Sequence, residues 1–178
     1  MKRVAFITSA SGNGGTTFAR VLAARLGVPF VELDALNHGS GWTEATLEEL
    51  QARVRPIVSS AAWVIDGSYR GKLGDLVFDR TEVIVWLDLP VRVWLTRLLR
   101  RTFGRIVRKE ELWHGNRETL RGAFVGRDAL IPWTLRHYRR RRRIYPERLA
   151  RFNLVRLRTP GDVDRFLASV NSQCVKGS

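Results

Sequence analysis

A glycine-rich segment near the N-terminus, Ser9-Ala-Ser-Gly-Asn-Gly-Gly-Thr-Thr17, joins an apolar run to a stretch of helical periodicity. In that position, successive backbone N–H groups and a helix N-terminus can surround the phosphates of a nucleotide. Compared with the pattern G-x-x-x-x-G-K-[ST], Gly14 and Thr16 match, whereas Ser9 replaces the first glycine and Gly15 replaces the lysine. The segment predicts a phosphate-binding loop, and a glycine turn that serves only tight packing is the alternative. The nucleotide contacts are expected from Ser11, Gly12, Asn13, Gly14, Gly15, Thr16 and Thr17.

Five short apolar runs, at residues 4–8, 29–32, 63–66, 83–87 and 154–157, alternate with helical patterns along the chain. Such alternation is typical of an α/β layer fold with a mostly parallel, doubly wound sheet of about five strands. Ligands of such folds bind outside the carboxyl ends of the strands. Polar residues that directly follow the runs are therefore the first candidates for a functional site.

Four helices are expected between these runs. The first covers residues 15–26 and ends at Gly27, and the second covers residues 43–59. A third begins near Pro90, and the last begins with Thr159 as its N-cap and reaches about residue 170. The side chains expected to face the core are Phe18, Val21, Leu22 and Leu26 on the first helix and Val93, Trp94, Leu98 and Leu99 on the third.

The segment 103–146 is too long for a simple connection and predicts an inserted, arginine-rich lid. A helix is expected over residues 128–145. Its run Arg139–Arg143 points around a whole helical turn, so we interpret most of it as a solvated or partner-binding face. The other cations of this segment are Arg105, Arg108, Lys109, Arg117, Arg121 and Arg127.

The composition indicates one folded domain over residues 1–178, because 44% hydrophobic and 27% charged side chains can bury one sizeable core. The one cysteine, Cys174, excludes an intramolecular disulfide and a cysteine-built zinc site, which fits a reducing cytoplasm. No apolar stretch approaches the about 20 residues of a membrane span. We therefore expect neither secretion nor membrane insertion.

The net charge of +14 lies in the second half of the chain. Residues 1–90 carry 9 Lys and Arg against 10 Asp and Glu, and residues 91–178 carry 22 against 7. The second half therefore predicts an anion-seeking surface. Only four of the 31 basic residues are lysine, and arginine suits phosphate and carboxylate groups, although codon bias gives the same composition. A nucleic-acid-binding protein is one alternative function.

Five further segments occur in a familiar order: VELDAL at 31–36 with Gly41-Trp42, WVIDGSYRG at 63–71, VIVWLDLP at 83–90, RLLRRTFGR at 97–105 and ELWHGNRETLR at 111–121. Over nearly its whole length the chain thus resembles the adenylate-kinase-like small-molecule kinases of the P-loop class, most closely a bacterial adenylate-kinase-related, topology-modulation-like branch. The resemblance implies a P-loop NTPase-type three-layer sandwich with helices on both faces of the sheet. It also implies phosphoryl transfer from ATP or another NTP, with Mg²⁺, to a small nucleotide-like or nucleoside-like acceptor.

The resemblance also implies roles at the carboxyl edge of the sheet. Thr16 would hold Mg²⁺, and Asp88 would contact the metal indirectly, with the N-cap of the helix at Pro90 as the alternative role of Asp88. Asp34 would orient or deprotonate the acceptor hydroxyl or hold Mg²⁺, and it is otherwise a turn residue. The acceptor pocket would be lined by Asp34, Trp42, Gly67 and Arg70, with Arg70 binding a phosphate or carboxylate.

Arginines would stabilise the transferring phosphoryl group. Arg97 and Arg101 lie one helical turn apart and would clamp it. Arg105, Arg117 and Arg127 would join them when the lid closes and excludes water.

Gly15 departs from the family, because a lysine at this position reaches the β- and γ-phosphates. Three interpretations stay open: an arginine of the lid or helix replaces the lysine, the chain binds nucleotide without turnover as a regulatory pseudo-kinase, or the glycine replaces a natural lysine. We expect an ATP-dependent kinase for a small acceptor, with the regulatory module and the nucleic-acid-binding protein as the alternatives.

Overall fold

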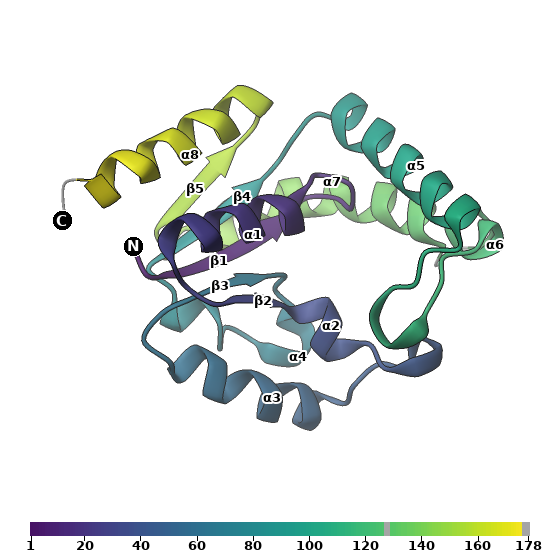
Figure 1. Ribbon diagram of the computed structural model, residues 1–178, viewed down its shortest axis with the longest axis horizontal. Helices are drawn as coiled ribbons and strands as arrows, with labels where there is room; N and C mark the ends of the chain where they lie inside the picture. The colour runs from purple at the N-terminus through teal and green to yellow at the C-terminus, as the bar shows by residue number, and fades with distance from the viewer. Residues whose placement is uncertain (127–128, 176–178) are drawn as a thin grey trace.

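Figure 1 shows the computed structural model, which describes residues 1–126 and 129–175. Five strands form one sheet in the order β2-β3-β1-β4-β5, and every neighbouring pair is parallel. The strands are β1 (Arg3–Thr8), β2 (Phe30–Glu32), β3 (Trp63–Asp66), β4 (Val83–Leu87) and β5 (Leu154–Leu157). The five predicted apolar runs and the parallel α/β sheet are therefore confirmed. Because all strands run the same way, their carboxyl ends meet at one edge.

Helices lie on both faces of this sheet (Figure 1). The helices are α1 (Gly15–Leu26), α2 (Leu33–Asn37), α3 (Leu47–Ser59), α4 (Arg70–Leu73), α5 (Val91–Arg108), α6 (Leu120–Phe124), α7 (Leu130–Arg148) and α8 (Pro160–Val175). Three short 3₁₀ turns are η1 (Ser40–Trp42), η2 (Phe78–Arg80) and η3 (Trp113–Gly115). No described helix is long and apolar enough to cross a membrane.

Alternate residues of each strand feed two hydrophobic clusters, one on each face. Phe6 and Val64 pack with α1 and α8, where Phe18 meets Phe6 at 5.0 Å and Phe166 at 6.0 Å between ring centroids. Ile65 and Trp86 pack with α3 and the end of α7 on the opposite face. The two clusters fix the carboxyl edge of the sheet between two rigid helical layers.

Three expected helix features differ from the structure. The second helix begins at Leu47, because Thr46 caps it and forms a capping box with Glu49. Leu99, expected in the core, is 38% exposed, and Val21 on α1 is 40% exposed. The last helix begins at Pro160 with the expected Thr159 hydroxyl bonded to the Asp162 N–H, and it continues beyond residue 170 to Val175.

The structure divides the segment 103–146. Residues 103–108 continue α5, and α7 spans 130–148, so the predicted start of that helix at Asp128 lies outside the described residues. Tyr138 and Tyr145 of α7 pack on Trp94 and Trp86, with ring centroids 5.3 and 5.5 Å apart. Helix α7 is therefore part of the core.

Candidate functional site

The loop at residues 9–14 lies at the carboxyl edge of the sheet, between β1 and α1. Gly12 and Gly14 have φ angles of 84° and 81°, a left-handed conformation that favours glycine. A Cβ atom on Gly12 would lie 2.5 Å from the Trp94 carbonyl oxygen, so the loop packs directly on α5. Gly14 is the N-cap of α1, and among the described residues no side chain caps this helix. The first intrahelical bond starts at the Phe18 N–H, which leaves the preceding N–H groups directed toward the edge.

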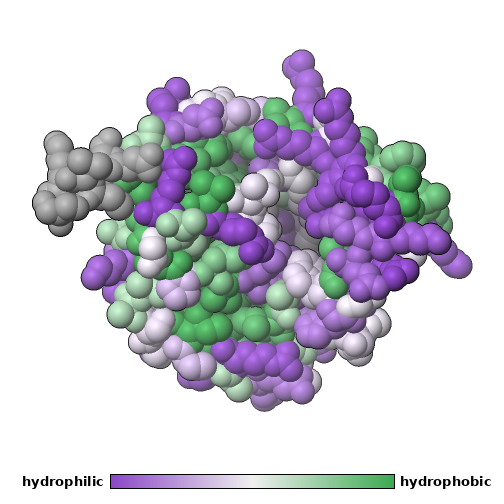
Figure 2. Space-filling view, viewed as in Figure 1, coloured by the Kyte–Doolittle hydropathy of each residue, from purple (hydrophilic) through white to green (hydrophobic). Residues whose placement is uncertain are grey.

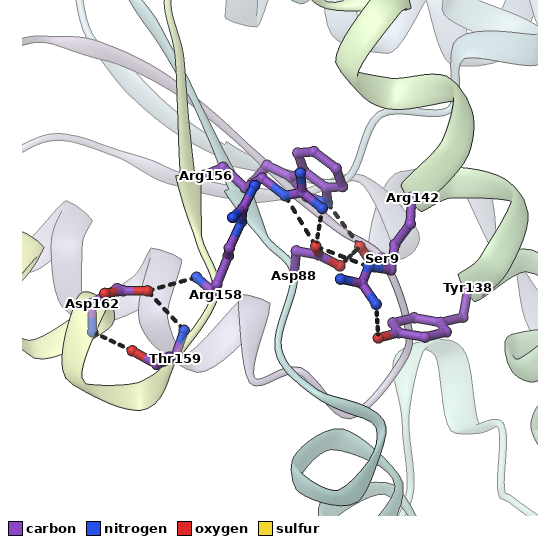
Figure 3. A network of polar contacts seen from close by, with 9 residues as sticks. Ser9, Asp88, Tyr138, Arg142, Arg156, Arg158, Thr159 and Asp162 are labelled. Atoms are coloured by element: carbon purple, nitrogen blue, oxygen red, sulfur yellow. Dashed lines mark hydrogen bonds and ion pairs between the residues drawn. The ribbon is translucent and has the colours of Figure 1, made fainter.

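Ser9 anchors the start of the loop to β4. Its hydroxyl donates to Asp88 Oδ1 at 2.7 Å and accepts a bond from Trp86 Nε1 at 2.8 Å. Asp88 is only 2% exposed and also accepts bonds from Arg142 Nε at 3.1 Å and Arg156 Nε at 3.0 Å (Figure 3). The serine at the first-glycine position therefore has a structural role that the sequence pattern did not indicate.

Of the two roles considered for Asp88 from sequence, the N-cap of the helix at Pro90 is wrong. Helix α5 has Pro90 at its N-cap and no side-chain cap bond there. The Asp88 carboxylate is held by guanidinium groups from α7 and β5, and its charge is thereby compensated within the protein. The acidic neighbours of Thr16 are two other carboxylates.

Thr16 donates a hydrogen bond to Asp66 Oδ2 at 2.6 Å, and its Oγ1 lies 3.5 Å from Glu32 Oε1. Glu32 and Asp66 are adjacent because they end the neighbouring strands β2 and β3 in register. Burial raises the pKa of Asp66 to about 6, and the nearby charges of Asp34 and Glu32 contribute. Burial likewise raises the pKa of Glu32, again with Asp34 adding to the shift.

These oxygens fit a hard divalent cation. Mg²⁺ usually takes one or two carboxylates together with substrate phosphates and water, and it does not need a cage made only of protein ligands. Among the described residues no group of three His, Cys, Asp or Glu side chains forms such a cage. Thr16 with Asp66 supplies a hydroxyl and a carboxylate next to the loop. Because the charges of Asp34 and Glu32 add to the raised pKa of the buried Asp66, a cation beside these carboxylates would be stabilised.

Asp34 follows β2 and faces an aromatic group. Its Oδ1 accepts a bond from the Tyr69 hydroxyl at 2.6 Å, and that hydroxyl lies 3.2 Å from His38 Nε2. Burial raises the pKa of Tyr69, with the Asp34 charge as the next cause, so Tyr69 stays a donor. His38 stacks on Trp113 at 6.2 Å and meets Trp42 edge-on at 5.8 Å between centroids.

The connection between α5 and α7 closes on this aromatic group. Asn116, 5% exposed, accepts a bond from the Trp42 N–H at 3.0 Å and donates to the Gly39 carbonyl at 2.9 Å. Glu118 accepts a bond from Arg105 at 2.9 Å and lies 3.9 Å from Arg101. The loop at residues 109–119 and the loop at residues 38–43 therefore form one wall of the site.

Four predicted acceptor and lid residues remain: Arg70, Gly67, Arg117 and Arg127. The guanidinium of Arg70 binds Asp75 and lies 5.6 Å from the Phe78 ring centroid, so it is engaged within the protein. Gly67 packs close to Leu33, because a Cβ atom there would lie 3.2 Å from the Leu33 Cβ. Arg117 pairs with Glu111 at 2.5 Å. Arg127 lies outside the described residues.

Gly15 occupies a crowded position. A Cβ atom on Gly15 would lie 2.7 Å from the Thr8 methyl carbon and 3.4 Å from Asp66 Oδ1. A side chain at this position therefore needs Thr8 to move, and it starts beside a carboxylate. The Thr8 side chain thus occupies space that a lysine at position 15 would need.

A cleft of about 440 Å³ adjoins the loop on the α1 and α8 side of the sheet. Val21, expected in the core, lines this cleft, which explains its exposure. The wall from α8 was not predicted, because no sequence signal links that helix to the loop. Figure 2 shows a hollow in the molecular face, with hydrophilic residues gathered on the α5 side of it. The cleft is lined by Asn13, Gly14, Thr17, Phe18, Val21, Leu87, Leu89, Arg97, Pro160, Val163, Asp164 and Leu167.

Comparisons with known proteins give little beyond this geometry. No family model matches the chain, and no curated protein matches it. Among solved structures, a sugar kinase from Janibacter sp. HTCC2649, in its unliganded form, matches over 99% of this chain and 94% of its own, with 15% sequence identity and a TM-score of 0.49.

Proposed function

We propose that the protein transfers the γ-phosphoryl group of ATP, or of another NTP, to a hydroxyl group of a small acceptor. The observation that carries this proposal is the loop before α1, whose left-handed Gly12 and Gly14 lead into a helix N-terminus with free N–H groups. Thr16 in the first turn supplies the hydroxyl and Asp66 the carboxylate for Mg²⁺. A packing turn alone does not require this combination.

The donor nucleotide is proposed to extend from the loop into the adjoining cleft. The phosphates would take the N–H groups of the first turn of α1. The cleft is largely apolar and opens beside Asn13 and Gly14, so it suits the base and sugar. Arg97 lines the same cleft and would place a guanidinium near the phosphates.

The acceptor is proposed to lie beside Asp34. Its hydroxyl oxygen attacks the γ-phosphorus, the bond from that phosphorus to the β–γ bridging oxygen breaks, and the acceptor proton passes to Asp34. Tyr69 holds the Asp34 carboxylate in place. Mg²⁺, when bound, would neutralise charge on the phosphates, and Arg97 and Arg101 would supply the cationic charge that Gly15 lacks.

A nucleotide-binding regulatory module without turnover is the second candidate. The crowding of Gly15 by Thr8 favours it, because the site has no space prepared for the usual lysine. Nucleic-acid binding is less favoured, since Arg141 and Arg142 of the arginine run already bind the Thr8 carbonyl and Asp88. The kinase and the regulatory module share the donor site, and only the kinase requires an acceptor.

Nucleotide binding is the first test. Saturating ATP with Mg²⁺ should raise the melting temperature, because a ligand that binds only the folded state stabilises it by mass action. Thr16→Ala should reduce the Mg²⁺-dependent part of the shift, whereas Ser169→Ala, on the exposed side of α8, should leave it unchanged. An unchanged melting temperature for the wild-type protein would contradict the proposal. Product formation with a panel of hydroxyl acceptors then separates the kinase from the regulatory module.

A further inference from the structure

Resting on the proposed function, we infer that the acceptor is an uncharged, ring-bearing hydroxyl compound and that acceptors carrying a phosphate are rejected. The resemblance seen in the sequence leaves nucleotides and nucleosides equally open. The distribution of charge around Asp34 separates them.

Every cation on the acceptor side is already engaged. We define the acceptor side as residues 30–80, from β2 to η2, all of which the structure describes. Lys72 Nζ donates to Asn37 Oδ1 at 2.8 Å, to Glu44 Oε2 at 2.7 Å and to the Ala45 carbonyl at 2.7 Å. Arg70, the one arginine next to the site in sequence, is bound by Asp75 and packs over Phe78.

The other three cations of the acceptor side bind elsewhere. Arg53 donates to the Leu36 carbonyl, Arg55 to Gln51 and Arg80 to Ser59. A phosphate on the acceptor would thus find no free guanidinium or ammonium group on this side. Rearrangement would have to break bonds that the protein has already formed.

Most groups that face the acceptor are carboxylates, and the nearby cation from α1 is the largely exposed Arg20, whose guanidinium lies 4.0 Å from Glu32 Oε2. Glu32, Asp34 and Asp66 meet at the ends of β2 and β3, and the buried Asp66 is close enough to the other two for their charges to affect it. Arg101 and Arg105 approach from α5, but both lie within 4 Å of Glu118, and Arg105 also lies 3.5 Å from Glu110, so their charge is partly compensated. The charge that remains is needed for the transferring phosphoryl group. A second phosphate at Asp34 is therefore repelled.

The aromatic side chains indicate what this wall can bind. Trp42 is 41% exposed, and its ring contacts those of His38 and Trp113, at 5.8 and 6.4 Å between centroids. The Tyr69 ring contacts His38 at 6.4 Å. Indole faces bind flat or ring-shaped apolar surfaces by stacking. A nucleoside or a sugar offers such a surface together with a free hydroxyl.

Matched pairs of compounds test the inference by isothermal titration of the full chain. The probes are adenosine with AMP, guanosine with GMP, and glucose with glucose 6-phosphate, each added with Mg²⁺ and a non-hydrolysable ATP analogue. We expect at least one unphosphorylated member to bind at least tenfold tighter than its phosphorylated partner. A phosphorylated member that binds equally well or better would overturn the inference, as would the failure of all unphosphorylated members to bind. Binding of the ATP analogue is measured separately, so failure of the donor site is distinguished from failure of this inference.

Two variants, Glu32→Gln and Trp42→Leu, test its physical basis, and each has a matched control. Glu32→Gln should reduce the discrimination against the phosphorylated member at least threefold, while Glu48→Gln, on the exposed first turn of α3, should not. Trp42→Leu should weaken the unphosphorylated member at least fivefold, and Trp42→Phe should restore most of the affinity. Unchanged discrimination in Glu32→Gln together with unchanged affinity in Trp42→Leu, in variants that melt like the wild type, would refute the electrostatic and stacking basis.

Discussion

Gly15 leaves the glycine-rich loop at residues 9–14 without the lysine of the P-loop pattern, and the Thr8 methyl group occupies the space where a side chain would begin. We predict that Gly15→Lys combined with Thr8→Ser raises phosphoryl transfer at least tenfold, because the serine removes the methyl carbon that a lysine would meet. Gly15→Lys alone should gain less. Initial rates at saturating ATP measure both variants. A folded double variant without any gain would argue against the kinase and for the regulatory module.

Asp66 should make the stability of the protein depend on pH. Its pKa is 3.8 in an unfolded chain and about 6 when buried, so between these values the native state keeps a proton that the unfolded state has released. The free energy of unfolding should therefore fall as the pH rises from about 4 to about 6, on the order of 1–3 kcal/mol in total, and stay level above that. Urea titrations of wild type and Asp66→Asn measure it: the variant should show a smaller fall, and the remainder comes from Glu32, whose pKa is also raised by burial. An equal fall in both would show that another group causes it.

The Ser9 hydroxyl bonds to two buried side chains, so its removal should lower the free energy of unfolding. We predict that Ser9→Ala destabilises the protein by about 1–3 kcal/mol, because Trp86 Nε1 and Asp88 Oδ1 would each lose a buried hydrogen bond. Ser59→Ala, at the exposed end of α3, should change stability by less than about 0.5 kcal/mol. Urea unfolding followed by tryptophan fluorescence measures both. Equal stability of Ser9→Ala and the wild type would contradict the anchoring role.

The contact between α5 and the glycine-rich loop at residues 9–14 leaves no room for a methyl group at Gly12. We predict that Gly12→Ala costs more than about 2 kcal/mol, because both its positive φ and the 2.5 Å approach to the Trp94 carbonyl oppose a Cβ atom. Gly41→Ala is the matched control, since Gly41 has a φ of 65° with nothing within 4 Å of a Cβ atom. It should cost only about 1 kcal/mol. Similar losses in the two variants would mean that strain alone, and not the packing on α5, decides the cost.

The strands could be predicted from the sequence because each is a short apolar run flanked by turn residues. The helix boundaries are less predictable: the helical pattern predicts a start of α3 at residue 43, whereas the capping box of Thr46 and Glu49 sets it at Leu47. Asp34 is a candidate site residue from sequence because it follows an apolar run. Glu32 and Asp66 satisfy the same rule, but their proximity depends on the pairing of β2 with β3, which a single sequence does not reveal. The engagement of Arg70 by Asp75 is likewise a tertiary contact.

At the scale of the whole molecule, the site joins the two halves of the chain. Asn116 links the loop at residues 109–119 to the loop at residues 38–43, over the acceptor side. We predict that Asn116→Ala raises the ratio of ATP hydrolysis to phosphoryl transfer severalfold, because an undocked loop admits water. Release of ADP with and without acceptor measures this ratio. An unchanged ratio would show that the contact does not control access to the site.

The charge of the second half is partly used inside the molecule. Arg142 and Arg156 compensate Asp88, and Arg101 and Arg105 share Glu118. The net charge of the second half is therefore larger than the positive charge that is left on the surface to bind an external anion. Composition could indicate the sign of this surface but not which arginines the fold retains.

The cleft beside the loop at residues 9–14 has one wall from α1 and another from α8, which come from opposite ends of the chain. During synthesis on the ribosome, the first wall emerges long before the second. A nucleotide bound as we propose would therefore gain its full set of contacts only after translation has reached α8, and it would not guide the early steps of folding.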